Sequence, residues 1–233
     1  MPVTVEMVSD LVCPWCWLGM RRIQSAIESV PDIEVALLFR PYELDPTIPK
    51  EGVDYKDYMR HRMGGTGPPS ETPETSRFRA MREALEQYGA EEGIPFNFSA
   101  ITRRPNSFDA HRLVRWAQGQ GVGSAVKEAL FSAYFEHGED IGDGAVLTRI
   151  ATENGLDRDI IAKLLSSDAD VVVVREEAEL FRQMGIAGVP TYIGDRRLAV
   201  QGAESAEKLA KFLTTLAAQQ PAQRPLDHPT GTA

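Results

Sequence analysis

The sequence predicts an α/β fold in which a βαβ unit and a ββα unit are separated by a large helical insertion. Three observations carry this prediction. A strand, an amphipathic helix and a second strand follow one another before residue 40. Across residues 49–184 the apolar residues recur at helical spacing. The alternation typical of strands returns near residue 190. Apolar periodicity is the main sequence signal for both kinds of element.

The first unit occupies residues 1–48. Val3–Val8 begins with alternating apolar and polar residues and ends apolar, which predicts a buried strand. From Pro14 to Val30 apolar residues recur at helical spacing, and a proline is tolerated in the first turn of a helix. Ile33–Phe39 is an aliphatic second strand. This order indicates a parallel pair with a right-handed crossover.

The insertion occupies residues 49–184. Asp157 is suited to cap a short helix that buries Ile160 and its apolar neighbours Ile161, Leu164 and Leu165. Val171–Val174 resembles a strand, but the apolar spacing continues to Phe181 and favours a helix. A loop is predicted at Gly64–Pro69. The remaining helices are predicted over residues 54–62, 75–88, 107–118, 124–135 and 146–154.

The second unit occupies residues 185–218. Gly185 and Gly188 end the preceding helix, and two short strands, Pro190–Ile193 and Leu198–Val200, are joined by a turn at Gly194-Asp195. A last helix has one apolar face, formed by Ala206, Leu209, Ala210 and Leu213. Residues 219–233 are rich in Pro, Gln and Thr without apolar periodicity, which predicts a flexible tail.

Composition and net charge indicate which kinds of partner and which compartment suit this chain. Hydrophobic residues make up 42% of the 233-residue chain and charged residues 25%, which is typical of soluble globular proteins. A net charge of -9 argues against nucleic acid or an anionic membrane surface as partner. No secretory signal or spanning segment is apparent, so we expect a cytoplasmic protein. The pairs Arg21-Arg22 and Arg103-Arg104 are predicted to be solvated.

The two cysteines occur in the sequence Cys13-Pro14-Trp15-Cys16, at the junction of the first strand and the first helix. Such a motif beside a βαβ pattern is typical of a thioredoxin-like redox site. Cys13 lies at the start of the helix, where free backbone N–H groups and the helix dipole favour an anion. We therefore expect Cys13 to be the accessible nucleophile. Cys16 begins the apolar face and is expected to be shielded, as a resolving cysteine should be.

A zinc half-site is the main alternative reading of the cysteine motif. Structural zinc requires four ligands, and the histidines show no ligand spacing relative to the cysteines or to one another. Redox chemistry is therefore favoured, and no metal is predicted. The four histidines are His61, His111, His137 and His228.

A second segment that bears on the thioredoxin-like interpretation is Gly188-Val189-Pro190-Thr191. Proline is poorly tolerated inside a central strand, so Pro190 at a strand start calls for an explanation. Taken alone, it is equally well explained as an ordinary turn proline.

Together these segments resemble the DsbA-like thioredoxin family, and within it the FrnE-like branch of predicted dithiol-disulfide isomerases. The resemblance implies a thioredoxin domain interrupted by an all-helical domain. It also implies that Pro190 is a cis proline facing the cysteines and that the backbone of Val189 pairs with an extended thiol substrate. The family resemblance covers residues 3 to about 216. The segments that carry it are Ser9–Cys16, Arg40–Pro46, Ala110–Leu113, Gly188–Thr191 and Gly202–Glu204.

Four further residues are candidates near the motif. Pro14 and Trp15 lie between the cysteines, where an aromatic side chain either contacts substrate or packs as a cover. Asp10 either stabilises the turn before the helix or moves protons for Cys16. His111 is either a packing histidine or an auxiliary site residue.

The leading functional hypothesis is a thiol-disulfide oxidoreductase or isomerase acting on protein or small-molecule thiols, with no tightly bound cofactor. The alternative is a glutathione-dependent enzyme similar to 2-hydroxychromene-2-carboxylate isomerases and kappa-class glutathione transferases, in which a serine normally stands at the position of Cys13. Retention of both cysteines favours redox chemistry. A binding module with a vestigial redox site is the third reading. Glutathione is a candidate redox partner or co-substrate. A homodimer is compatible with the sequence, which does not decide the oligomeric state.

Overall fold

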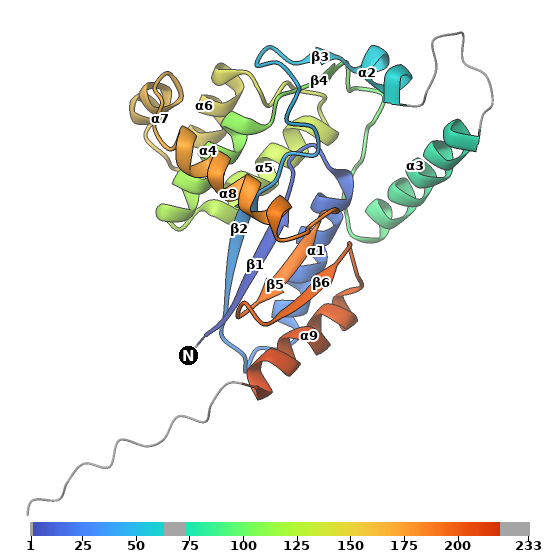
Figure 1. Cartoon of the computed structure of the whole chain (residues 1–233), viewed down its shortest axis with the longest axis vertical. Helices are drawn as coiled ribbons and strands as arrows, with labels where there is room; N and C mark the ends of the chain where they lie inside the picture. Colours follow the sequence, from blue (N-terminus) through green and yellow to red (C-terminus); the bar gives the residue numbers. More distant parts are fainter. Residues whose placement is uncertain (1, 63–72, 220–233) are drawn as a thin grey trace, which may run out of the picture.

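A four-stranded mixed sheet forms the centre of the computed structural model, which describes residues 2–62 and 73–219. The strand order is β2-β1-β5-β6 (Figure 1). β1 (Val3–Ser9) pairs in parallel with β2 (Val35–Pro41), as the βαβ pattern predicts. β5 (Thr191–Gly194) runs antiparallel to β1, and β6 (Leu198–Gln201) antiparallel to β5. The predicted βαβ–ββα order is confirmed.

Helices cover both faces of this sheet. α1 (Pro14–Glu28) and α9 (Ala206–Ala218) pack together on one face, which is lined by Val5 and Met7. The opposite face is covered by α8 (Val171–Gln183), whose Phe181 packs with Val8. Alternate β1 residues thus enter different cores, as a strand buried on both faces requires.

The insertion between β2 and β5 is mainly helical but not all-helical, which corrects the expectation. Two short strands, β3 (Val53–Asp54) and β4 (Arg103–Arg104), pair antiparallel. In the view of Figure 1, α4 to α7 gather on one side of α1 and α3 stands on the other. The helices are α2 (Tyr55–Arg62), α3 (Pro73–Glu91), α4 (Phe108–Gly119), α5 (Gly123–Phe135), α6 (Gly144–Glu153) and α7 (Arg158–Leu165).

The insertion and the sheet region share one core. The Trp17 ring of α1 lies 6.1 Å from the rings of both Phe131 and Phe135 of α5, in stacked orientations, and 5.4 Å from the ring of Phe96 edge-on. Aromatic pairs at such separations add to the free energy of burial. Rotation of the insertion against α1 would therefore break apolar packing.

Polar contacts seal the outer edge of the sheet. β2 is an edge strand, and the side-chain amide of Gln118 from α4 bonds both the N–H and the C=O of Phe39, at 2.7 and 3.0 Å. Arg40 bridges Glu6 of β1 and Glu177 of α8. The free backbone groups that an edge strand exposes are thus partly satisfied by the insertion.

Element boundaries differ in a few places from the prediction. β2 begins at Val35 because the N–H of Ile33 closes a turn onto the carbonyl of Val30. Asp157 caps α7 as predicted, but Ile160 is 58% exposed and only its neighbour Ile161 is deeply buried.

Some predictions lie outside the residues that the structure describes. These are the Gly64–Pro69 loop and all but the first residue of the predicted tail. Among the described residues, no helix is both long and apolar enough to cross a bilayer.

Candidate active site

Cys13 is the N-cap residue of α1, and Cys16 lies in its first turn. The N–H of Cys16 donates to the carbonyl of Cys13 at 2.9 Å, and both thiols are free. The two cysteines approach each other to 3.5 Å. The first turn of α1 contains no acidic residue and no side-chain cap, so the positive end of the helix dipole faces the Cys13 sulfur without a competing anion on the helix.

Burial of the two cysteines differs less than expected. Cys16 is fully buried, but Cys13 is itself only 5% exposed, so the prediction of a freely accessible nucleophile is wrong in degree. Burial, together with the neighbouring Cys13, raises the pKa of Cys16 well above the usual value for a thiol. Cys16 is therefore a neutral thiol at physiological pH.

The segment before β5 faces the cysteine pair. The Val189–Pro190 peptide bond is cis, the isomer that the family resemblance implies. The Cys13 thiol donates to the carbonyl oxygen of Val189 at 3.7 Å. The structure thus brings together Cys13, Val189 and Pro190, which the sequence places 176 positions apart.

Gly19 allows α1 to approach this segment closely. A Cβ at Gly19 would stand 2.4 Å from the Tyr192 hydroxyl and 2.8 Å from Cγ of Pro190. Both distances are too short for real contacts, so a side chain here would displace β5 or α1. The absence of a side chain at Gly19 therefore positions the proline against the motif.

Asp10 is a fully buried carboxylate at the centre of a polar network. It accepts hydrogen bonds from the Ser107 hydroxyl and the Leu44 N–H, each at 2.8 Å, and from the Val12 N–H at 3.4 Å. Burial opposes ionisation, but the hydrogen bond and charge of His111, with Arg104 and the Leu44 N–H, outweigh it and lower the pKa of Asp10. Asp10 ties the motif to the insertion.

His111 of α4 is buried beside this network. Its Nε2 lies 3.1 Å from the carbonyl oxygen of Tyr42 and 3.5 Å from Oδ1 of Asp10. The structure thus joins the two auxiliary candidates to each other. Their roles in chemistry stay predictions.

Arg22 and Arg104 are not solvated, contrary to the expectation for these arginine pairs. Arg22 bonds Glu92 and the carbonyl of Ala203, each at 2.8 Å, and its guanidinium lies 5.0 Å from the Tyr88 ring centre. Arg104 is buried and contributes charge to the Asp10 network. Adjacent charges in a sequence do not reveal which one faces inward.

Trp15 lies half-buried beside the motif. Its ring centre is 6.2 Å from that of Tyr88 in α3, in a tilted orientation, and Tyr88 is 38% exposed. Pro14 opens α1. Together, Trp15 and Tyr88 form an aromatic contact between the motif and α3.

Lys127 of α5 is a residue that the sequence reasoning missed. It is fully buried, and burial lowers its pKa to about 8, although the charges of Cys16 and Asp10 act in the opposite direction. The signal was present in the pattern. Lys127 stands between Val126 and Leu130, at a position that helical spacing assigns to the apolar face.

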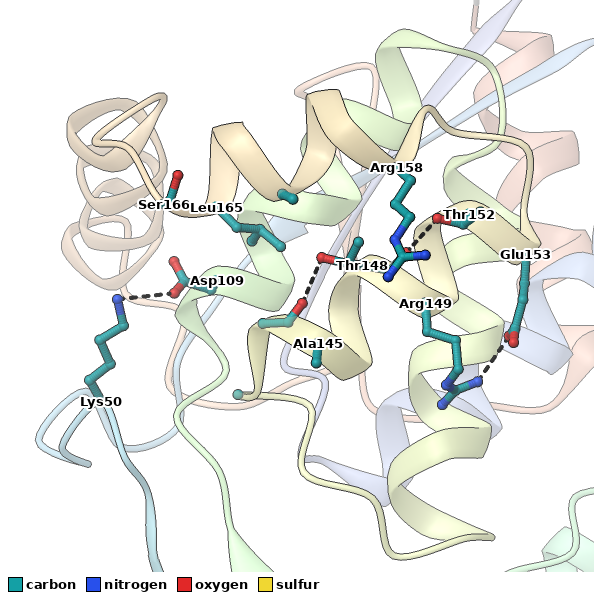
Figure 2. A pocket seen from close by; sticks show the side chains of 13 residues that line it. Lys50, Asp109, Ala145, Thr148, Arg149, Thr152, Glu153, Arg158, Leu165 and Ser166 are labelled. Atoms are coloured by element: carbon teal, nitrogen blue, oxygen red, sulfur yellow. Dashed lines mark hydrogen bonds and ion pairs between the residues drawn. The ribbon is translucent and has the colours of Figure 1, made fainter.

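Several hollows of the surface lie along the insertion and include neither cysteine in their lining. One cavity of about 820 Å³ between α4, α6 and α7 contains neither cysteine in its lining. Figure 2 shows two ion pairs in its lining, Lys50 with Asp109 and Arg149 with Glu153. Within residues 2–62 and 73–219, no group of three or more His, Cys, Asp or Glu side chains is arranged to hold a metal.

Known structures share this fold. The probable DsbA oxidoreductase SCO1869 of Streptomyces coelicolor is 26% identical, with a TM-score of 0.83 over 99% of this chain and 98% of that one. A 2-hydroxychromene-2-carboxylate isomerase is 18% identical, with a TM-score of 0.68 over 93% and 97% of the two chains. The cytosolic disulfide reductase DsbM of Pseudomonas aeruginosa, solved with GSH, is 19% identical, with a TM-score of 0.59 over 92% and 99%. The last two show the fold alone.

Sequence comparison agrees with the structural one. The uncharacterized protein YwbO of Bacillus subtilis (strain 168) is 27% identical over 194 residues, which cover 83% of this chain and 87% of YwbO. The family described as the DSBA-like thioredoxin domain matches residues 4–214, the strands, helices and insertion included. The chain belongs to the DSBA-like thioredoxin domain family.

Proposed function

We propose that the protein is a thiol-disulfide oxidoreductase or isomerase in which Cys13 is the nucleophile and Cys16 resolves the mixed disulfide. The observation that carries the proposal is the dithiol itself: two free cysteines 3.5 Å apart in the first turn of α1, with Cys13 at the N-cap and Cys16 sealed. This arrangement places one sulfur at the start of the helix, 5% exposed, and the resolving sulfur fully buried behind it.

The exchange proceeds in two displacements. The Cys13 thiolate attacks a substrate disulfide, which forms a mixed disulfide and releases one substrate thiolate. Cys16 then loses its proton and attacks the Cys13 sulfur, which forms the Cys13–Cys16 disulfide and releases the second substrate thiolate. Two electrons pass from the protein to the substrate, and the reverse sequence oxidises a substrate dithiol.

The surroundings of Cys13 suit a substrate chain. The backbone of Val189 lies within reach of the Cys13 sulfur, and the rings of Trp15 and Tyr88 offer apolar contact beside it. The substrates we propose are protein or small-molecule thiols and disulfides, with glutathione as a redox partner. Support for glutathione comes from the DsbM structure that contains it. No further cofactor is needed, since the sulfurs carry the electrons.

The finer assignments are part of this proposal. We assign the chain to the FrnE-like branch on the motifs described above and to the cytoplasm, a compartment that the similar cytosolic DsbM also occupies. A homodimer is retained as a prediction.

A redox titration tests the function. The protein is equilibrated in graded glutathione buffers and followed by Trp fluorescence, since Trp15 and Trp17 adjoin the cysteines. We expect a reversible two-electron transition between about -270 and -120 mV, the range of related folds. Cys13→Ser should abolish it. Cys16→Ser should instead accumulate a mixed disulfide at Cys13, because the resolving thiol is absent.

A second candidate function, glutathione-dependent isomerisation, has two supporting observations. The similarity to 2-hydroxychromene-2-carboxylate isomerase extends over 93% of the chain, and the uncapped start of α1 is also suited to hold the thiolate of bound glutathione. Saturable glutathione binding that survives Cys13→Ser, without a redox transition in the parent protein, would select this function over disulfide exchange.

A further inference from the structure

A cavity of about 720 Å³ lies between the loop after β2, the start of α4, the end of α7 and one face of α8. Neither cysteine lines it. Its volume is within the range of small-molecule sites, about 300–1,000 Å³. On the α8 side, Val171, Arg175, Glu179 and Arg182 recur at helical spacing, so a single stripe of this helix faces the cavity.

Most charged side chains of this lining are paired inside the protein. Arg112 donates to Asp109 at 2.7 Å and to three backbone carbonyls. Lys50 lies 3.8 Å from the other oxygen of Asp109. Arg182 lies 3.4 Å from Glu179 and donates to a backbone carbonyl at 2.7 Å. These groups therefore need no ligand to balance their charge.

Glu43 and Arg175 differ from these pairs. Within the part of the chain that the structure describes, no hydrogen bond or ion pair reaches the carboxylate of Glu43 or the guanidinium of Arg175. Glu43 is half-buried, and burial raises its pKa although nearby cations act in the opposite direction. Arg175 is exposed and lies 5.2 Å from the Phe108 ring centre, a contact that engages its charge but none of its N–H donors. Asp168 also lacks a partner but is exposed, so only Glu43 is a carboxylate partly removed from water.

We propose that this cavity binds a short apolar peptide with free termini, whose ammonium group contacts the Glu43 carboxylate and whose carboxylate contacts the Arg175 guanidinium. A guanidinium presents paired N–H donors that match a carboxylate, and a carboxylate in a partly dry site is stabilised by a cation that brings donors of its own. A simple anion would meet Glu43 as well as Arg175, and a simple cation would meet Arg175 as well as Glu43. A zwitterion compensates both groups at once.

The rest of the lining indicates the size and character of this ligand. Pro46, Phe108, Leu165 and Val171 line the cavity with apolar atoms, and small-molecule sites combine such surface with a few placed polar groups. A free amino acid is much smaller than 720 Å³, whereas a di- or tripeptide with apolar side chains fills more of that volume. The ligand class is therefore a short apolar peptide rather than a single amino acid.

The proposed site shares a segment with the network around Asp10. Leu44, the residue after Glu43, donates its N–H to Asp10 at 2.8 Å. The peptide would therefore lie against the loop that supports the redox motif, although neither cysteine lines the cavity. The proposal does not depend on the disulfide-exchange function.

The first test measures binding of the dipeptide Leu-Leu to the full chain by isothermal titration calorimetry. Two blocked peptides are compared with it: N-acetyl-Leu-Leu, which lacks the ammonium group, and Leu-Leu amide, which lacks the carboxylate. We expect Leu-Leu to bind saturably at a single site. Each blocked peptide should bind about tenfold more weakly, because it has lost one charge-assisted contact.

Two variants locate the contacts. Glu43→Gln should weaken the binding of Leu-Leu and leave that of N-acetyl-Leu-Leu unchanged, because the acetylated peptide has no ammonium group to lose. Arg175→Gln should weaken Leu-Leu and leave Leu-Leu amide unchanged. This crossed pattern is a double-mutant cycle in which one partner is the ligand. We expect both variants to fold, since neither substitution breaks a pair within the protein. Should Glu43→Gln lose its thermal transition, the blocked peptides still test the ammonium contact on the parent.

Arg158→Gln and Glu176→Gln are the matched controls. Arg158 lines the neighbouring cavity between α6 and α7, and Glu176 lies on another part of the α8 surface. Both controls should bind Leu-Leu like the parent. The proposal is overturned if Leu-Leu does not bind saturably, if blocking either end leaves its affinity unchanged, or if a control variant weakens binding as much as Glu43→Gln and Arg175→Gln do. None of these results bears on disulfide exchange, which the redox titration measures separately.

Discussion

At the scale of single residues, the site depends on a carboxylate that no solvent reaches. Asp10 receives hydrogen bonds from Val12, Leu44 and Ser107, which come from three different segments of the chain. An ionised group in such a position is stable only while its donors are present. Asp10 therefore holds the loop before α1 in place.

We expect Asp10→Asn to destabilise the fold by about 2–3 kcal/mol at pH 7, because an amide cannot accept from all of these donors. The folded state lowers the pKa of Asp10, so its contribution is complete above the pKa of the unfolded chain and is lost as pH falls through the folded value. The difference between parent and variant should thus shrink below pH 4. Urea unfolding at pH 7 and pH 3 measures it.

Asp32→Asn, at an exposed position in a turn, is the matched control and should change stability little at either pH. A constant difference between parent and Asp10→Asn at both values would show that Asp10 acts through its shape rather than its charge.

The sequence predicted the site residues that a local pattern defines and missed those that only folding assembles. Cys13 at the N-cap and Cys16 inside followed from the apolar spacing and from Pro14. Ser107 meets Asp10 across 97 positions, and no periodicity connects them. Lys127 lay in a visible apolar stripe, but without the fold nothing indicated that its ammonium lies against the ring of Phe39 in β2.

At the scale of elements, α1 lies close to β5 because Gly19 has no side chain. We expect Gly19→Ala to destabilise the protein by about 1–3 kcal/mol, since overpacking against Pro190 and Tyr192 outweighs the better helix propensity of alanine. Exchange activity should fall as well, because the displaced proline no longer faces Cys13. Thermal unfolding and the rate of mixed-disulfide formation measure the two effects.

Gly119→Ala is the matched control at the end of α4. A Cβ there meets nothing within 4 Å, so this variant should be stabilised by up to about 1 kcal/mol with unchanged activity. Equal effects at both glycines would refute the close approach of α1 to β5.

The longer helices and strands were predicted from the sequence, whereas the shortest strands were missed. Long helices carry several turns of apolar spacing, and even the β-branched run at Val171–Val174 was correctly assigned to a helix because Ala178 and Phe181 continue the stripe. β3 and β4 have two residues each, too few to show a period. Their pairing is fixed by the tertiary contacts of the insertion.

At the scale of the whole molecule, the boundaries between the predicted parts do not coincide with gaps in packing. Residues of β1, α1, α5, α6 and α9 belong to one continuous core. The predicted boundaries near residues 48 and 184 therefore describe chain order, and independent folding of either part stays untested.

We expect the chain to unfold in one cooperative transition. Trp15 and Trp17 report on α1, Trp116 reports on α4, and far-ultraviolet circular dichroism reports on all helices. Shared packing of Trp17 with Phe131 and Phe135 predicts that these signals change together in urea. Two separated midpoints would instead show that the insertion is an autonomous unit.

The position of Lys127 has a consequence for how such proteins diversify. The buried lysine is encoded in the insertion, whereas the two cysteines are encoded more than a hundred codons earlier. Recombination that replaced the insertion with that of a relative would exchange the residue at this position while leaving both cysteines untouched. The insertion is thus a heritable element whose replacement changes the charge buried in the shared core while the two cysteines stay the same.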